Sequence, residues 1–362
     1  MGLPLPVDHF NDMSVKIVTV SKALPEFSRT TKEILPLLET WLSSQDERFV
    51  RKVVKIFEGA EVDKRYSIMD PADVFSIKSF EERNDIYSQA AIVLGEKVLQ
   101  DALNKANWLP ESLDYIITVS CTGIMIPSLD AYLVNRLNLR RDIVRLPVTE
   151  MGCAAGISGI IYAKNFLKAN PGKRAGVIAV ESPTATFQLD DFSMANMVSA
   201  AIFGDGAACV LLSSADNDEG PEIIAEEMYH FYDNEHMMGF KLTNSGLQMV
   251  LDIEVPDTIA SHFPEIIHPF LAKNKLEIAN MDYLIFHPGG KKIIRTVEDL
   301  FLKLGKNIDD TKEVLRLYGN MSSATVLFVL ERILEKNPTK GEKGIMLSFG
   351  PGFSAQRILL QW

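Results

Sequence analysis

Residues 281–290 read Met281-Asp282-Tyr283-Leu284-Ile285-Phe286-His287-Pro288-Gly289-Gly290, a short apolar run that ends abruptly in histidine, proline and glycine. The start of this stretch has a near copy much earlier in the chain, Leu113-Asp114-Tyr115-Ile116-Ile117. Each copy is typical of a buried β-strand followed by a turn and a helix-like segment. A duplicated α/β architecture explains the pair, and it is the fold class that we expect.

Around the two copies, short β-rich runs alternate with helical patterns from Ser14 onward, which favours βα units and a largely parallel sheet. The polar stretch at residues 213–221 is the best internal boundary. It predicts an N-terminal half over residues 14–215 and a C-terminal half over residues 222–362. We predict strands at residues 115–120, 143–148, 176–180, 207–213, 283–286 and 344–348, and helices at residues 85–104 and 320–336.

The composition is that of a large soluble protein, with 362 residues of which 47% are hydrophobic and 23% charged. The formal net charge of −11 disfavours nucleic acid and anionic membrane surfaces as partners. Asp8, His9 and Asp12 interrupt any apolar signal-peptide core, and no later run suits a membrane span. Because the three cysteines form no CxxC pattern, we expect a reducing, cytoplasmic location.

Cys153 lies between a predicted strand and a predicted helix, in Thr149-Glu150-Met151-Gly152-Cys153-Ala154-Ala155-Gly156-Ile157. The N-terminus of a helix favours thiolate over thiol, and small neighbours leave room for a substrate. These features suit a nucleophile, whereas the alternative is an inert buried cysteine. Cys121 and Cys209 lie on apolar strands and are more typical of packing.

His287 and Asn320 are candidate partners of this cysteine. His287 follows a strand, where α/β proteins place ligand-facing groups, although a hydrogen-bonded core histidine would fit as well. Asn320 opens the helix predicted at residues 320–336 and could simply be its N-cap. The spacing also allows a papain-like hydrolase, but Gly152-Cys153-Ala154-Ala155-Gly156 differs from the CGSCW-like segment of that family.

Metal and nucleotide sites have little support in the sequence. His230, His236, His262 and His268 have no metal-binding spacing. The segment at residues 203–208 has the glycines of a phosphate loop without its lysine, and it predicts a tight turn. We therefore expect no metal and no cofactor.

Four segments together resemble the type III polyketide synthases, the chalcone and stilbene synthase-like enzymes. The Cys121-Thr122-Gly123 segment is more similar to bacterial members than to plant ones. The resemblance runs from Ser14 to Trp362 and implies a thiolase fold, with two similar αβαβα halves in a five-layered core and a homodimer with buried active sites. Ser348 departs from the family's usual GFGPG, and we expect the turn to tolerate it because it needs the later glycines. The segments are Phe286-His287-Pro288-Gly289-Gly290, Tyr318-Gly319-Asn320-Met321-Ser322-Ser323-Ala324, Phe203-Gly204-Asp205-Gly206-Ala207-Ala208 and Ser348-Phe349-Gly350-Pro351-Gly352.

The resemblance implies an acyltransferase with acyl-CoA and malonyl-CoA as substrates. Cys153 would receive the starter acyl group, with His287 as its base and ion-pair partner. His287 and Asn320 would bind the malonyl thioester carbonyl and stabilise the enolate left by decarboxylation. This carbanion would extend the chain repeatedly before cyclisation. The starter, the number of extensions and the product, whether pyrone, resorcinol, phloroglucinol or naphthalene, stay open.

The resemblance also assigns the cavity walls. The two gatekeeping phenylalanines of the family fall on Phe203, which is retained, and on Met249, a departure that would put a flexible apolar side chain at the tunnel mouth. Ordinary core packing is the alternative for Met249. Ile126 matches the residue that reaches across the dimer into the partner's cavity. The remaining cavity positions fall on Cys121, Thr186, Phe240, Ser322, Gly350, Pro351 and Gly352.

The basic residues that bind coenzyme A in the family fall on Lys52 and Lys55, while Gly59 stands where a third lysine is expected. A solvated helix face is the alternative for both lysines. The missing charge leaves an acyl carrier protein open as the acyl donor, because phosphopantetheine fits the same tunnel.

Three rival functions remain. A ketoacyl carrier-protein synthase III-like enzyme would perform a single condensation on the same fold, but the segments at residues 320–323 and 350–352 favour the polyketide branch. A Cys–His–Asn hydrolase would release free acid without consuming malonyl-CoA. A non-catalytic scaffold would keep the fold and the dimer, and an intact triad argues against it.

Overall fold

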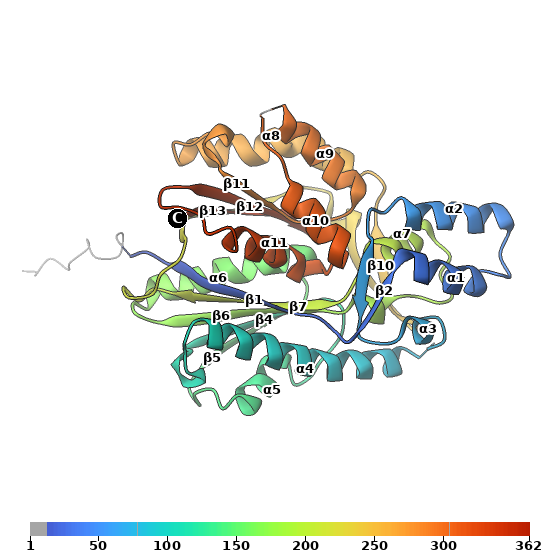
Figure 1. The fold of residues 1–362 in the computed structure, drawn as a ribbon, viewed down its shortest axis with the longest axis horizontal. Coiled ribbons are helices and arrows are strands. Elements are labelled where there is room, and N and C mark those ends of the chain that lie inside the picture. The colour runs from blue at the N-terminus through green and yellow to red at the C-terminus, as the bar shows by residue number, and fades with distance from the viewer. Residues whose placement is uncertain (1–12, 78, 304) are drawn as a thin grey trace, which may run out of the picture.

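Two central helices, α6 (Ala155–Ala169) and α11 (Thr325–Leu334), lie between two groups of strands (Figure 1). The computed structural model describes residues 13–77, 79–303 and 305–362, so the prediction about a signal peptide at the start of the chain lies outside the described residues. The nine-stranded sheet has the order β11-β12-β13-β8-β1-β7-β6-β4-β5. Because β1 and β8 share only the pair Lys16 and Glu222, the sheet divides there into an N-terminal arm and a C-terminal arm.

The N-terminal arm holds the first strands of the chain, and the C-terminal arm holds the last. The N-terminal arm consists of β1 (Lys16–Ala23), β4 (Tyr115–Val119), β5 (Val144–Val148), β6 (Arg174–Glu181) and β7 (Gly206–Ser213). The C-terminal arm consists of β8 (Glu222–His230), β11 (Tyr283–Phe286), β12 (Lys343–Gly350) and β13 (Ser354–Gln361).

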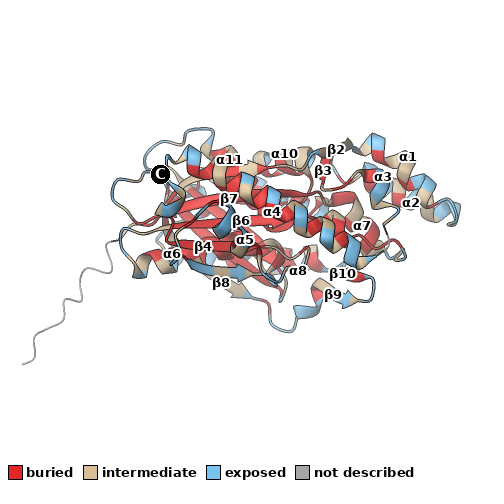
Figure 2. Ribbon diagram, turned by 90° about the horizontal axis from the view of Figure 1, so that it is seen from below, coloured by how far each residue is buried: buried red, intermediate tan, exposed pale blue. Residues whose placement is uncertain are grey.

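Helices cover both faces of each arm, which produces the predicted five layers. In the N-terminal arm, Ile117 and Val177 join the core around α6 and α11, whereas Ile116 and Ile178 face the opposite way, toward α4 and α5. Figure 2 shows the resulting pattern of buried strands beneath helices such as α4, whose outer surface is exposed. The outer helices are α4 (Phe80–Lys105) and α5 (Leu129–Arg136) on one side, and α8 (Val255–Lys273) and α9 (Lys291–Leu302) on the other.

The sheet is mixed, so the prediction of a largely parallel sheet was wrong. In the described part of the chain, parallel pairing is confined to β11–β12, β4–β5 and β4–β6 at the two ends of the sheet. The strands between them pair antiparallel. One reason is the tight turn between β12 and β13, since a connection that short joins antiparallel neighbours.

The predicted strands are all present, with ends that differ by at most two residues. The helix predicted at residues 85–104 lies within α4, which begins earlier because Ser79 caps it: its Oγ accepts a hydrogen bond from the Glu82 N–H at 3.3 Å. The helix predicted at residues 320–336 starts too early, because a 3₁₀ turn, Ser322–Ala324, precedes α11. Asn320 is therefore not the N-cap of α11.

A smaller group of elements closes the end of the molecule away from the C-terminus (Figure 1). These elements supply walls of the cavities described below. They are β2 (Phe27–Thr30), β3 (Lys64–Ser67), the hairpin of β9 (Met238–Thr243) and β10 (Gly246–Leu251), α1 (Thr31–Trp41), α2 (Glu47–Glu58), α3 (Pro71–Val74) and α7 (Met194–Ile202), while α10 (Asp309–Tyr318) leads toward Asn320.

Candidate active site

One cavity brings together Cys153, His287 and Asn320, which come from three separate parts of the chain. The cavity has an empty volume of about 710 Å³ and is mostly apolar. A charge that develops inside it is shielded from water, so nearby dipoles act on it strongly. Of the predicted wall residues, Phe203, Met249, Cys121, Phe240, Ser322 and Pro351 also line this cavity.

Cys153 lies on a 3₁₀ turn, Gly152–Ala154, directly before α6. This is the predicted junction between a strand and a helix. Gly152 has φ +48°, and a Cβ there would lie 2.5 Å from Cδ of Pro351, so only glycine allows the turn to pack so closely. On the other side, the Ser348 hydroxyl donates a hydrogen bond to the carbonyl of Cys153 at 2.7 Å. Ser348, the residue that departs from the family's pattern, therefore supports the nucleophile.

His287 follows β11 and is 3% exposed. Its backbone N–H donates to the Leu347 carbonyl at 2.9 Å, which fixes the start of the loop. Among the residues that the structure describes, neither ring nitrogen has a hydrogen-bond partner. Burial lowers the pKa of His287 to about 3. A neutral imidazole that faces the cavity with both nitrogens free is suited to act as a base.

Asn320 is oriented by two hydrogen bonds to its amide oxygen. Oδ1 accepts from the Ser322 N–H at 2.8 Å and from the Thr325 hydroxyl at 3.3 Å. Since both donors occupy the oxygen, the NH₂ group is the end of the amide that remains for the cavity. This orientation could not be predicted from the sequence, because it depends on the turn that precedes α11.

The pKa of Cys153 reflects opposing influences. Burial is the largest influence and raises the pKa, hydrogen bonds with Ser322 and Asn320 lower it, and the nearby Glu181 raises it, so that the net pKa is about 12. The distance from Sγ of Cys153 to Oγ of Ser322 is 3.6 Å. Burial by itself therefore favours the thiol, and a stable thiolate needs a further positive partner.

Glu181 is a residue of this site that sequence reasoning missed. It lies at the end of β6, fully buried, where burial raises its pKa. Its carboxylate accepts hydrogen bonds from the Cys121 N–H at 3.0 Å, the Thr122 hydroxyl at 2.9 Å and the Ser323 hydroxyl at 2.5 Å. Glu181 thus ties the loop after β4 to the loop before α11. A lone glutamate at the end of an apolar strand carries no sequence motif that would reveal this role.

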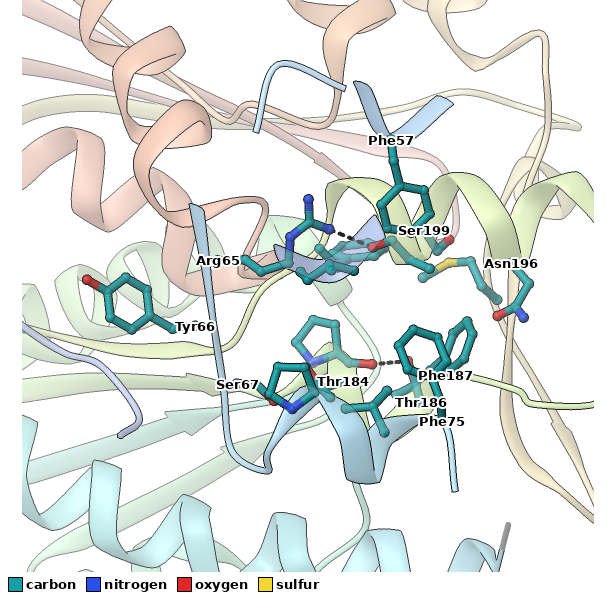
Figure 3. Close-up of a pocket in the computed structure, with 17 residues that line it drawn as sticks. Phe57, Arg65, Tyr66, Ser67, Phe75, Thr184, Thr186, Phe187, Asn196 and Ser199 are labelled. Carbon is teal, nitrogen blue, oxygen red and sulfur yellow. Dashed lines mark hydrogen bonds between the residues drawn. The ribbon is translucent and has the colours of Figure 1, made fainter. Parts of the chain in front are cut away.

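A second, apolar chamber adjoins the first (Figure 3). The two share Pro183, Phe203 and Met249 as wall residues. Thr186, one of the predicted cavity positions, lines this second chamber and is not among the residues that line the catalytic cavity. The rings of Phe57, Phe75 and Phe187 surround the space, which has an empty volume of about 740 Å³.

A third cavity leads from the catalytic cavity toward lysines. It shares Ile202, Leu251, Gly289 and Ile293 with the catalytic cavity, and its other lining residues include Lys55, Gly59, Lys291 and Lys292. Of the two predicted coenzyme A-binding lysines, Lys55 lines this cavity. Lys52 is exposed on α2 and lies outside the lining of this cavity.

Three predicted residues lie away from the catalytic cavity. Gly350 packs against the nucleophile's turn, since a Cβ there would lie 2.5 Å from the Met151 carbonyl oxygen. Gly352 has φ +71°, which glycine adopts without strain. Ile126 is 94% exposed and is not among the residues that line the catalytic cavity.

Within residues 13–77, 79–303 and 305–362, no group of three or more His, Cys, Asp or Glu side chains is arranged to hold a metal ion. The helices in the same ranges include none that is long and apolar enough to cross a membrane.

Comparisons with known proteins give one consistent result. Sequence models of the N-terminal and C-terminal domains of chalcone and stilbene synthases match residues 14–216 and 225–362. The 1,3,6,8-tetrahydroxynaphthalene synthase of Streptomyces peucetius subsp. caesius is 31% identical over 357 residues, covering 97% of this chain and 94% of that protein. Phloroglucinol synthase of Pseudomonas fluorescens is 28% identical over 340 residues, covering 93% and 96%.

Solved structures agree with the sequence comparisons. The crystal structure of 1,3,6,8-tetrahydroxynaphthalene synthase from Streptomyces coelicolor A3(2), a bacterial type III polyketide synthase, has a TM-score of 0.90 at 27% identity and covers 96% of this chain and 99% of its own. PKS-I from the brown alga Ectocarpus siliculosus has a TM-score of 0.88 at 26% identity, with 96% and 98% covered. The likeness therefore extends over nearly the whole length of each protein.

Proposed function

This chain belongs to the chalcone and stilbene synthase family, the type III polyketide synthases, and we propose that Cys153, His287 and Asn320 carry out its chemistry. The protein is a decarboxylative condensing enzyme that extends its substrate repeatedly and forms an aromatic product. Single condensation and hydrolysis are not favoured, because the relatives named above are polyketide-forming synthases.

Loading begins with the neutral imidazole of His287. It takes the proton of Cys153 while the sulfur attacks the carbonyl carbon of a starter acyl-CoA. The carbon–sulfur bond to coenzyme A breaks, and the leaving thiolate receives the proton back from His287. The starter is then held as a thioester on Cys153. This assignment is supported by the free ring nitrogens of His287 and by the position of both side chains on one cavity.

Extension uses the same cavity with malonyl-CoA. The thioester carbonyl of malonyl-CoA accepts hydrogen bonds from the Asn320 NH₂ group and from a ring N–H of His287. Loss of CO₂ leaves an enolate on that oxygen, and two donors in a water-poor site stabilise the developing charge. The enolate carbon attacks the Cys153 thioester, the Cys153 sulfur leaves, and the chain has grown by two carbons. Transfer back to Cys153 allows another round.

The protein is proposed to act as a homodimer. Ile126 is 94% exposed and Val144, on the edge strand β5, is 47% exposed, so an apolar surface is available beside the N-terminal arm. In the dimer, Ile126 would reach into the partner's cavity. A cytoplasmic location is part of the same proposal, since a reducing compartment would keep Cys121, Cys153 and Cys209 as free thiols.

The observation that carries the proposal is the convergence of Cys153, His287 and Asn320 on one mostly apolar cavity. To test it, the purified protein is incubated with radiolabelled malonyl-CoA and a panel of starters from acetyl-CoA to long-chain and aromatic acyl-CoAs, and products are identified by mass spectrometry. We expect products at least two malonyl units longer than the starter, and none from Cys153→Ala. Products extended by a single unit would contradict the proposal.

A further inference from the structure

Lys291 is the first residue of α9. Its ammonium group lies close to Gly59, the position at which the family's third coenzyme A-binding lysine is expected. Gly59 follows α2 directly, and a side chain at that position would begin 4.0 Å from Nζ of Lys291. The Lys291 ammonium group therefore reaches the vacant place from the C-terminal half of the chain. Sequence spacing alone does not reveal this, because Gly59 and Lys291 are far apart in the chain and only the fold brings the Lys291 side chain to Gly59 and to the nearby Glu61.

The cavity that Lys291 lines leads to the catalytic residues. Its charged lining residues are three lysines and one carboxylate, Lys55, Lys291, Lys292 and Asp252, so the lining carries a net positive charge. The cavity shares a wall with the catalytic cavity that includes Gly289, two positions after His287. If a ligand bound its anionic group at the lysines, the rest of that ligand could therefore extend through the shared wall toward Cys153.

Glu61 holds Lys291 at this place without neutralising the site completely. Oε1 of Glu61 lies 3.1 Å from Nζ of Lys291 and 3.3 Å from Nη2 of Arg295. Two cations thus share one carboxylate, so Lys291 can bind a phosphate while Arg295 keeps its pair with Glu61. The Lys291 side chain is 29% exposed and that of Arg295 is 63% exposed, which places Lys291 in the better shielded position.

We propose that Lys291, together with Lys55, binds the phosphate groups of the coenzyme A thioester and replaces the charge absent at Gly59. This inference rests on the proposed function, since it assigns the donor of that same site. Coenzyme A carries a diphosphate and a 3′-phosphate, and an ammonium group is a suitable point-charge partner for either. The direct donor is thus the coenzyme A thioester rather than an acyl carrier protein.

The test compares Lys291→Gln with Arg295→Gln as its matched control. Each change removes one positive charge from α9, and each removes one partner of the Glu61 carboxylate. Arg295, however, is not among the residues that line the cavity. Both variants are assayed with malonyl-CoA and with the N-acetylcysteamine thioester of malonate, which has no phosphate. For Lys291→Gln we expect KM for malonyl-CoA to rise about five- to tenfold with kcat nearly unchanged. We expect no such rise in KM when Lys291→Gln is assayed with the phosphate-free thioester, or when Arg295→Gln is assayed with malonyl-CoA.

Several results would overturn the inference while leaving the proposed function intact. The first is an unchanged KM for malonyl-CoA in Lys291→Gln. The second is an equal rise in the KM of Lys291→Gln for the phosphate-free thioester. The third is an equal rise in the KM of Arg295→Gln for malonyl-CoA. Wild-type turnover with a malonyl carrier protein but not with malonyl-CoA would overturn it too. Wild-type protein that forms no extended product from any of these thioesters would instead contradict the proposed function itself.

Discussion

Phe203 and Asn320 form an isolated parallel β-bridge between two distant segments of the chain. The Asn320 N–H donates to the Ile202 carbonyl at 2.7 Å, and the Gly204 N–H donates to the Asn320 carbonyl at 3.1 Å. Phe203 stands in the wall shared by the two chambers, and Asn320 carries the amide that we assign to the malonyl carbonyl. The wall and the amide therefore have a fixed relative position, and a change that displaces one displaces the other.

Gly319→Ala should disturb this bridge. Gly319 has φ +73°, and its Cβ would lie 2.9 Å from the Ile202 carbonyl oxygen. We expect a loss of about 1–3 kcal/mol in the free energy of unfolding, measured by urea denaturation, and at least a tenfold loss of malonyl-CoA decarboxylation. The matched control is Gly172→Ala, which has φ +74° and no atom within 4 Å of the added Cβ. Equal losses of activity in both variants would contradict the role of the bridge.

Cys153→Gln should separate decarboxylation from condensation. The variant has no nucleophile for loading, yet His287 and Asn320 still bind the malonyl thioester. We expect continued release of labelled CO₂ from malonyl-CoA and no extended product. Adding Asn320→Leu to this variant removes one donor to the enolate oxygen and should slow CO₂ release about 10²- to 10³-fold. If CO₂ release stops in Cys153→Gln while circular dichroism shows an intact fold, the roles are assigned wrongly.

His287→Gln should make Cys153 less reactive toward iodoacetamide near neutral pH. Burial is the main reason that the pKa of Cys153 is raised to about 12. When the neutral His287 accepts the thiol proton, the imidazolium that forms stabilises the thiolate and favours this transfer. Removing that partner raises the thiol pKa, so less thiolate is present at a given pH. We expect wild-type Cys153 to be alkylated at least about tenfold faster at pH 7.5, because one pKa unit is a factor of ten. Equal rates and equal pH profiles would show that His287 does not pair with the sulfur.

Met249→Phe should narrow the range of starters. Met249 belongs to the wall between the catalytic cavity and the second chamber, and a flexible thioether yields to a passing alkyl chain more easily than a ring. We expect long-chain acyl-CoAs to lose at least tenfold in kcat/KM while acetyl-CoA is nearly unaffected. Met238→Phe is the control, because Met238 lines the catalytic cavity without bordering the second chamber. An unchanged chain-length preference in Met249→Phe would exclude Met249 as a gatekeeper.

The sequence predicts the local elements of this protein better than their partners in space. The strands around Tyr115 and Tyr283 are found as expected, because apolar runs between turns are short-range signals. The predicted parallel direction of most strands was wrong, because an alternation of strands and helices along the chain does not determine which strands become neighbours in the sheet. Cys153, His287 and Asn320 could be named from sequence motifs. Three other features depend on contacts between segments far apart in the chain: the hydrogen bond from Ser323 to Glu181, the hydrogen bond from Ser348 to the Cys153 carbonyl, and the approach of Lys291 to Gly59. Such contacts leave no pattern in one sequence.

The shared inner layer of α6 and α11 also determines when chemistry can begin during synthesis. Cys153 precedes α6, Asn320 precedes α11, and the Cys153 carbonyl is held by Ser348 of β12, one of the last strands to leave the ribosome. A nascent chain that lacks its final segment has a thiol but neither the completed turn nor the enclosed cavity. Because Phe349 and Pro351 of the same segment also line the cavity, we expect decarboxylation to begin only after β12 and the turn that follows it have been synthesised.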